Sequence, residues 1–134
     1  MRLWHYKLIP VLPNQMLVSQ WRECIAIKRQ WEKGTLKHRL VSYVKEHSKE
    51  MFYMYVELVI YELEKRNIKY KKQYKKELLG FCKEDITGLA YFLKYKEHND
   101  RYLKQCYYNL QEKYDRGIIS EEEWKKIESE ISQL

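Results

Sequence analysis

The sequence predicts an all-α protein, a compact single-domain bundle of about four to five helices. Apolar side chains recur every three or four positions along most of the chain, and no segment shows the alternation typical of a strand. Four glycines and two prolines leave little material for the turns of a β architecture. At 134 residues, the chain is expected to form one domain over residues 1–134 with a hydrophobic core of its own.

The first long helix is expected over residues 14–33. Pro10 and Pro13 keep the approach extended, Asn14 is a suitable N-cap, and Gly34 stands where a C-terminal stop belongs. One face is apolar apart from a lysine: Leu17, Val18, Trp21, Cys24, Ile25, Lys28 and Trp31. The neighbouring face carries Gln15, Ser19, Arg22, Glu23, Ala26, Arg29 and Lys33. Any chemistry on this helix is expected on that second face.

The middle of the chain contains one strong helix and two ambiguous segments. Residues 37–44 predict a short helix without a cap, and residues 48–66 predict a long amphipathic helix that Asn67 can end in a left-handed conformation. Residues 69–76, rich in lysine and tyrosine, fit either an exposed helical turn or a basic loop. Residues 91–93 resume the apolar pattern after two glycines.

Two further helices are expected in the C-terminal third. The first begins near Asn99 or Asp100 and ends at Gly117. Ser120 and Glu123 have the spacing of a capping box, which predicts a last helix through residues 124–131.

The charge balance points to a polyanionic partner. The 26 lysines and arginines exceed the 19 acidic residues, giving a formal net charge of +7. A positive field of this kind attracts polyanions but says nothing about the fold. Nucleic acid is the commonest such partner and an anionic membrane surface the next, while a lysine-rich surface that is merely solvated is the third interpretation.

The cysteines and the apolar runs bear on the compartment. Cys24, Cys82 and Cys106 are odd in number and widely spaced, which argues against a disulfide framework or a zinc site and favours a reducing cytoplasm. No apolar run approaches the roughly 20 residues of a membrane span, and the N-terminus lacks the apolar region of a signal peptide. We therefore expect a cytoplasmic protein that has no membrane partner.

The N-terminal half carries a family resemblance. The chain begins MRLWH, continues LIPVLPNQ over residues 8–15, and reads QMLVSQWREC over residues 15–24. Weaker matches are the Glu-Lys-Arg run at 64–66 and the YKEHND run at 95–100. These features resemble the phage-type pyrimidine-dimer DNA glycosylases and their bacterial relatives, continuously from residue 1 to about residue 68 and in patches over 95–110.

The resemblance implies a helical DNA-repair enzyme that acts on damaged double-stranded DNA with no metal or organic cofactor. In this family the N-terminal α-amine attacks the sugar C1′, expels the base, and leaves a Schiff base whose elimination nicks the strand. Met1 and Glu23 are therefore the expected catalytic residues, with the carboxylate assisting. Since a residue as large as Arg2 generally blocks removal of the initiator methionine, Met1 itself is expected to carry the amine. The expected DNA-binding residues are Arg2, Gln15, Arg22, Arg29, Lys33 and His98.

Two positions depart from the family pattern, and several alternatives stay open. Met16 stands where the phage enzyme has a histidine, and Ala26 where it has an arginine whose role Arg29 could cover. His98 fits a phosphate contact at a helix start and a satisfied core histidine equally well. The rival functions are a non-catalytic DNA-binding relative and a helical protein–protein adaptor. We expect a monomer.

Overall fold

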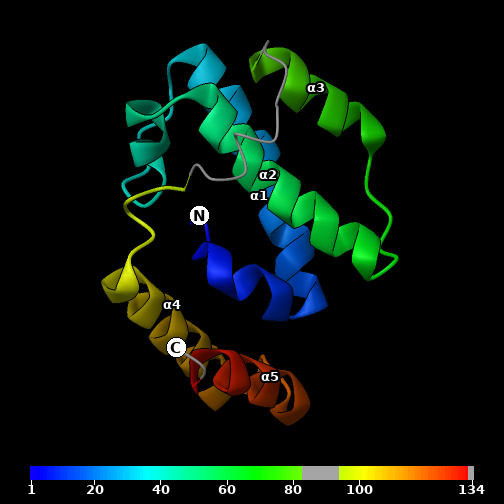
Figure 1. Cartoon of the computed structure of the whole chain (residues 1–134), viewed down its shortest axis with the longest axis vertical. Coiled ribbons are helices and arrows are strands. Elements are labelled where there is room, and N and C mark those ends of the chain that lie inside the picture. Colours follow the sequence, from blue (N-terminus) through cyan, green and yellow to red (C-terminus); the bar gives the residue numbers. More distant parts are fainter. Residues whose placement is uncertain (83–93, 133–134) are drawn as a thin grey trace.

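The fold is a set of helices without strands in residues 1–82 and 94–132, the part of the chain that the computed structural model describes (Figure 1). In this part the α-helices are α1 (Asn14–Lys33), α2 (Lys49–Lys65), α3 (Lys72–Cys82), α4 (Asp100–Asp115) and α5 (Glu121–Ser132), and the 3-10 helices are η1 (Tyr6–Val11) and η2 (Ser42–Glu46). The all-α class and the number of helices are thus as predicted. The predicted apolar segment at 91–93 lies outside the described residues. No described helix is long and apolar enough to cross a membrane.

Helix α1 ends as predicted but begins differently. Gly34 is left-handed, with φ 75°, and its N–H bonds back to the last turn. The prediction of Asn14 as N-cap is wrong, because Pro13 occupies that position and no side chain caps the helix. The Asn14 Oδ1 instead accepts a hydrogen bond of 2.9 Å from Arg66 Nη1, at the end of α2. A tertiary contact therefore takes the place of the expected local cap.

The two ambiguous segments take different conformations. The predicted helix over 37–44 is instead a turn followed by the short η2. The Leu40 N–H donates to the His38 Nδ1 and not to a backbone carbonyl, as it would inside a helix. Helix α2 begins at a Ser48 cap, whose side chain accepts from the Met51 N–H. It ends before Asn67, which is left-handed with φ 58°, as predicted. Of the lysine- and tyrosine-rich stretch, residues 72–76 form the start of α3.

The C-terminal helices form an antiparallel pair. Asn99 caps α4, Gly117 is left-handed with φ 79°, and Ser120 and Glu123 exchange the two hydrogen bonds of a capping box, all as predicted. The ring of Trp124 stacks on both Tyr107 and Tyr114, at centroid distances of 5.2 and 5.1 Å. This stacking fixes α5 on α4.

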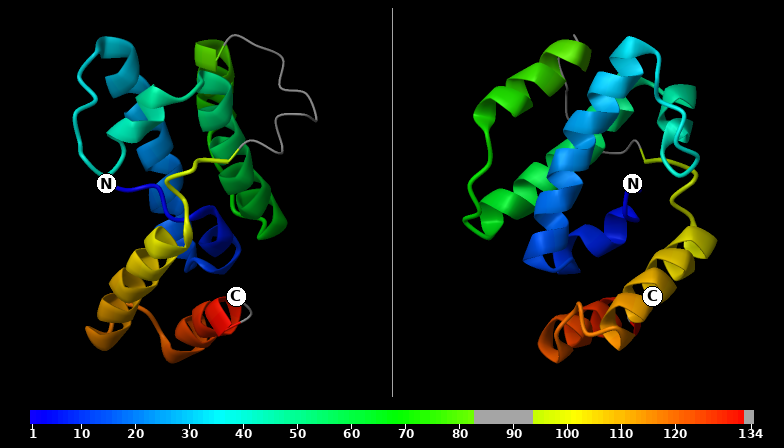
Figure 2. Two further views of the ribbon diagram at one scale, coloured as in Figure 1. Left: turned by 60° about the vertical axis from the view of Figure 1, so that its left-hand side comes forward. Right: turned by 180° about the vertical axis from the view of Figure 1, so that it is seen from behind.

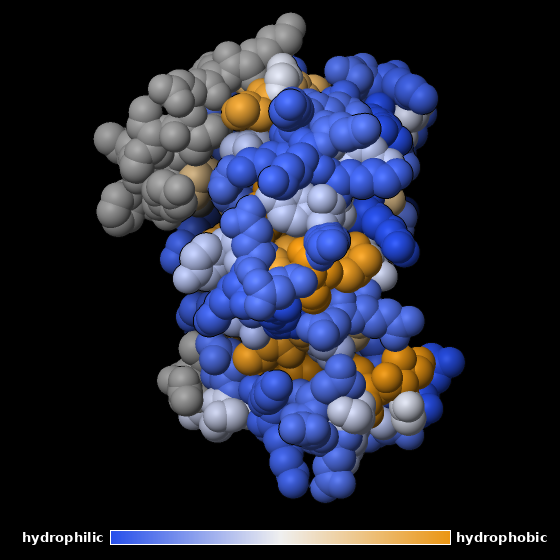
Figure 3. Space-filling view, turned by 90° about the vertical axis from the view of Figure 1, so that its right-hand side faces the viewer, coloured by the Kyte–Doolittle hydropathy of each residue, from blue (hydrophilic) through white to orange (hydrophobic). Residues whose placement is uncertain are grey.

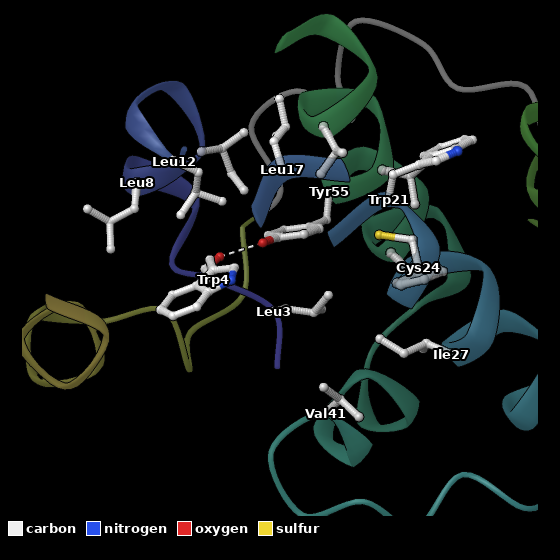
Figure 4. Close-up of a cluster of buried hydrophobic side chains, with 14 of the residues drawn as sticks. Leu3, Trp4, Leu8, Leu12, Leu17, Trp21, Cys24, Ile27, Val41 and Tyr55 are labelled. Atoms are coloured by element: carbon white, nitrogen blue, oxygen red, sulfur yellow. Dashed lines mark hydrogen bonds between the residues drawn. The ribbon is translucent and has the colours of Figure 1, made fainter. Parts of the chain in front are cut away.

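The N-terminal segment lies between the α1–α2 pair and the α4–α5 pair (Figure 1). Helices α1 and α2 pack against each other, α3 packs against both, and α5 packs against η1. The N-terminal segment and α3 lie on opposite sides of α1, as the rear view in Figure 2 shows. Leu3 and Trp4 are buried in the same core as Leu17 of α1 and Tyr55 of α2 (Figure 4). The start of the chain is therefore part of the core and has a defined position beside α1.

Candidate functional site

The N-terminal segment is held at its backbone by two tyrosines. The Tyr55 hydroxyl donates to the Trp4 carbonyl at 2.5 Å, the bond drawn in Figure 4, and the Tyr102 hydroxyl donates to the Leu3 carbonyl at 2.5 Å. Because these tyrosines come from α2 and α4, helices from the middle and from the C-terminal third of the chain fix the path of the segment. The side chains of Leu3 and Trp4 add apolar burial to these bonds.

Gln20 connects this segment to α1. Its side chain is 1% exposed, and its Oε1 accepts from the Trp4 N–H at 2.8 Å. Its Nε2 donates to the Arg2 carbonyl at 2.9 Å and to the Glu23 Oε2 at 3.1 Å. The Tyr55 hydroxyl also lies 3.0 Å from the Gln20 Oε1. The amide therefore has partners for its oxygen and for both of its N–H groups, and it places the Glu23 carboxylate beside the backbone of residue 2.

Glu23 shares the Gln20 amide with the backbone of Arg2, the residue that follows Met1. Glu23 and Met1 are both half-buried, and the Met1 side chain packs against the core. The Cα of Met1 is about 3.8 Å from the Cα of Arg2, whose carbonyl accepts from the same Gln20 Nε2 as Glu23 does. Of the two predicted catalytic residues, Glu23 thus binds the Gln20 amide directly, and Met1 precedes the residue whose carbonyl binds it. No ion pair to Glu23 is present within residues 1–82 and 94–132.

Four of the predicted DNA-binding residues share one exposed stripe of α1. At about 100° per residue, Gln15, Arg22, Arg29 and Lys33 lie within an arc of about 40°, and all four are exposed. Arg29 is the member with a strong partner, since its Nε and Nη2 donate to the two carboxylate oxygens of Glu77 on α3, at 3.0 and 3.1 Å. The stripe therefore presents an amide and three cations, one of them already paired.

The other two predicted DNA-binding residues turn inward. Arg2 is half-buried, with Nη1 3.9 Å from the Cys106 Sγ and its guanidinium 5.4 Å from the Trp4 ring centroid. His98 is 6% exposed, and its Nδ1 accepts from the Tyr6 N–H while its Nε2 lies 2.7 Å from the Tyr43 hydroxyl. Burial lowers the pKa of His98 to about 3, so the ring is neutral and its Nε2–H donates to Tyr43. This geometry favours the core-histidine alternative over a phosphate contact.

Sequence reasoning missed Gln20. A signal was available, because Gln20 lies three residues after Leu17 and four before Cys24, on the buried side of α1. A buried polar side chain requires partners, so its position alone indicates a hydrogen-bonding role. His5 was missed in the same way: it is 1% exposed, its Nδ1 accepts from the Lys7 N–H, and burial lowers its pKa to about 4. Among the described residues, no three His, Cys, Asp or Glu side chains form a group suited to a metal ion.

Comparison with known proteins identifies the family. The family model for pyrimidine dimer DNA glycosylase matches residues 1–77. The chain belongs to the pyrimidine dimer DNA glycosylase family. The matched range contains η1, α1, η2, α2 and the first half of α3, and with them Gln20 and Glu23, whereas α4 and α5 follow it. No curated protein and no solved structure matched the chain.

Proposed function

We propose that this protein is a DNA glycosylase with apurinic/apyrimidinic lyase activity on damaged duplex DNA of the pyrimidine-dimer type. The α-amine of residue 1 is the nucleophile: its nitrogen bonds to the sugar C1′ as the bond from C1′ to the base breaks, and the base departs with that electron pair and a proton. Cleavage of the C1′–O4′ bond then opens the sugar ring, with a proton going to O4′, and leaves an imine at C1′. Loss of a C2′ proton eliminates the 3′ phosphate, which cuts the strand. Glu23 stabilises the positive charge that develops on the sugar and moves the proton when the ring opens.

The observation that carries this proposal is that the Gln20 side-chain amide donates both to the backbone of residue 2 and to Glu23. One amide group binds the Arg2 carbonyl and the Glu23 carboxylate, which supports Glu23 as a general acid/base acting one residue from the start of the chain. α-Amino groups titrate near about 7.7–8.0, whereas lysine side chains titrate near about 10.4, so an N-terminal amine is the nucleophile that is partly neutral at cellular pH without special burial. Membership of the pyrimidine dimer DNA glycosylase family supports damaged DNA as the substrate.

The exposed stripe of α1 supplies the affinity for DNA in this proposal. Arg22 and Lys33 are exposed cations on the same helix as Glu23. The net charge of +7 draws the protein to a duplex, and phosphate contacts set its orientation. The three cysteines are buried and widely spaced along the chain, which fits a cytoplasmic protein with access to DNA.

The test is borohydride trapping on duplex DNA with one abasic site, using protein whose intact mass shows that Met1 is the first residue. We expect a covalent complex, and peptide mapping should place the adduct on Met1. Glu23→Gln should retain DNA binding but lower strand cleavage by about 10² or more, the scale for a general acid/base. Ser19→Ala, an exposed change one turn earlier, is the matched control.

Three results would each contradict a different part of the proposal: the nucleophile, the role of Glu23, or catalysis as a whole. An adduct on a lysine side chain removes the α-amine from the mechanism. Cleavage by Glu23→Gln at the parental rate makes Glu23 a surface residue. Binding without any trapping or cleavage favours the non-catalytic relative.

A further inference from the structure

We propose that α3 and the residues before it form a second contact surface for the phosphate backbone of duplex DNA. This surface, here called the α3 basic surface, consists of Lys69, Lys71, Lys72 and Lys76. The inference rests on the proposed function, because it extends the DNA footprint of the same site. It adds a partner contact on the side of α1 opposite the N-terminal segment.

The fold separates the tyrosines of this stretch from its lysines. The Tyr70 ring packs edge-on against Trp21 of α1, at 5.2 Å between centroids, and its hydroxyl donates to Glu64 at 2.5 Å. The Tyr74 ring lies 5.4 Å from the Arg29 guanidinium and is partly buried. The two rings are therefore occupied by contacts within the protein, which disfavours them as stacking platforms for bases. The four lysines remain exposed.

The acidic side chains nearby are already paired. Glu77 accepts from Lys28 at 3.2 Å and from Arg29, and Glu64 accepts from Tyr70. None of the four lysines of the α3 basic surface forms an ion pair with a residue in 1–82 or 94–132. The positive charge of this surface is therefore available to an external anion.

The α3 basic surface continues the exposed stripe of α1. Arg29 joins the two helices through Glu77 and Tyr74, and α1 lies between α3 and the N-terminal segment (Figure 2). The side of the molecule on which α3 lies is predominantly hydrophilic (Figure 3). A rigid polyanion lying across α1 can therefore reach the catalytic residues on one side and the lysines of α3 on the other.

The packing of α3 favours DNA over a membrane as that polyanion. A helix that binds a lipid surface needs an apolar face free to enter the interface beside its lysines. The apolar face of α3 is instead buried in the core, through Leu78, Phe81 and Cys82. Apart from Leu79, which is 42% exposed, α3 offers charged and polar side chains to the outside, as backbone recognition of DNA requires.

The test compares two triple variants by fluorescence anisotropy over a series of salt concentrations. The first is Lys69→Gln with Lys72→Gln and Lys76→Gln; Lys71 is kept because its amine lies 5.4 Å from the Tyr74 ring centroid. The control is Lys104→Gln with Lys125→Gln and Lys126→Gln, three exposed lysines of α4 and α5. The probe is a short duplex with one tetrahydrofuran abasic analogue, which binds but cannot form an imine.

We expect the α3 variant to bind more weakly at low salt and to lose about 0.9 in the slope of log affinity against log salt for each phosphate contact removed. The control should keep the parental slope, and both should melt like the parent because only exposed side chains change. Equal slopes for the parent and the α3 variant overturn the inference, whether or not the parent traps abasic DNA. An α3 variant that loses only its binding to phosphatidylserine vesicles overturns it in favour of a membrane.

If the α3 variant has a smaller salt slope than the parent but the parent gives no borohydride trapping, the α3 basic surface is supported and only the proposed function is contradicted. A parent that binds no DNA at low salt overturns both.

Discussion

Replacing Gln20 by leucine should weaken the protein through the backbone of its first residues. Leucine has a similar volume and keeps the apolar contacts, but it leaves the Trp4 N–H and the Arg2 carbonyl without a partner. Each buried polar group left unpaired costs about 1–3 kcal/mol. The Arg2 carbonyl is only partly buried and can recover water, so we expect a loss of about 2–4 kcal/mol in the free energy of unfolding.

The assay is urea denaturation followed by circular dichroism, with Ser19→Ala as control. The control lies on the exposed side of the same helix and should change the unfolding free energy by no more than about 0.5 kcal/mol. At temperatures where Gln20→Leu stays folded, its imine trapping should be slower by about 10²-fold, the usual cost of misplacing a reacting group by an ångström.

A second substitution, Gln20→Glu, separates positioning from packing. The new carboxylate can still accept from the Trp4 N–H, but it cannot donate to Glu23 unless it is protonated. Two carboxylates at this distance repel each other when both are ionised, so the variant should be less stable at pH 8 than at pH 5, relative to the parent. A loss below 1 kcal/mol for Gln20→Leu, together with no pH difference for Gln20→Glu, would refute the role assigned to this amide.

Two further predictions concern groups that position the core. His98 is neutral in the folded state with a pKa of about 3 against an ordinary 6.5, so its contribution to stability is complete above pH 6.5 and is lost as the pH falls, by about 2 kcal/mol at pH 5. Urea denaturation above pH 6.5 and at pH 5 should show that the unfolding free energy of His98→Gln falls between these pH values by about 2 kcal/mol less than that of the parent. An equal fall in both proteins would contradict a neutral His98 in the folded state. Arg66→Ala should cost about 3–5 kcal/mol, because it leaves the buried carboxylate of Glu62 unpaired and frees the carbonyls of Leu12 and Pro10. Thermal melts should show little change for its exposed neighbour, Lys65→Ala, and a comparable small change for Arg66→Ala would refute this account.

The helices could be predicted from the sequence where local signals and packing agree. Ser120 and Glu123 cap α5 with bonds between residues three apart, and Gly34 ends α1 by its own backbone conformation. Such features need no knowledge of the rest of the chain. The start of α1 failed because the Asn14 side chain binds Arg66, 52 residues away. No local rule contains a partner at that separation.

The candidate site was predictable in part for the same reason. The sequence placed Glu23 and Arg22 on the polar side of α1, because helical spacing alone fixes that relation. Gln20 acquires its role from the path of residues 2–4, which Tyr55 and Tyr102 determine from distant helices. The inward orientation of Arg2 follows from that path too, since Arg2 faces α4. Long-range packing therefore decides which of the predicted residues can meet.

The chemical identity of the group that holds Glu23 bears on the proposed reaction. A lysine or arginine in the place of Gln20 would orient the carboxylate but would also neutralise it. The amide of Gln20 orients Glu23 with a neutral N–H, and Arg22, about 100° away around the helix, makes no ion pair with it. The negative charge of Glu23 thus remains available beside the first residue, where the proposed reaction develops positive charge on the sugar. Electrostatic stabilisation requires such a fixed and unneutralised charge, and a neutral donor anchored in the core is a means of providing it.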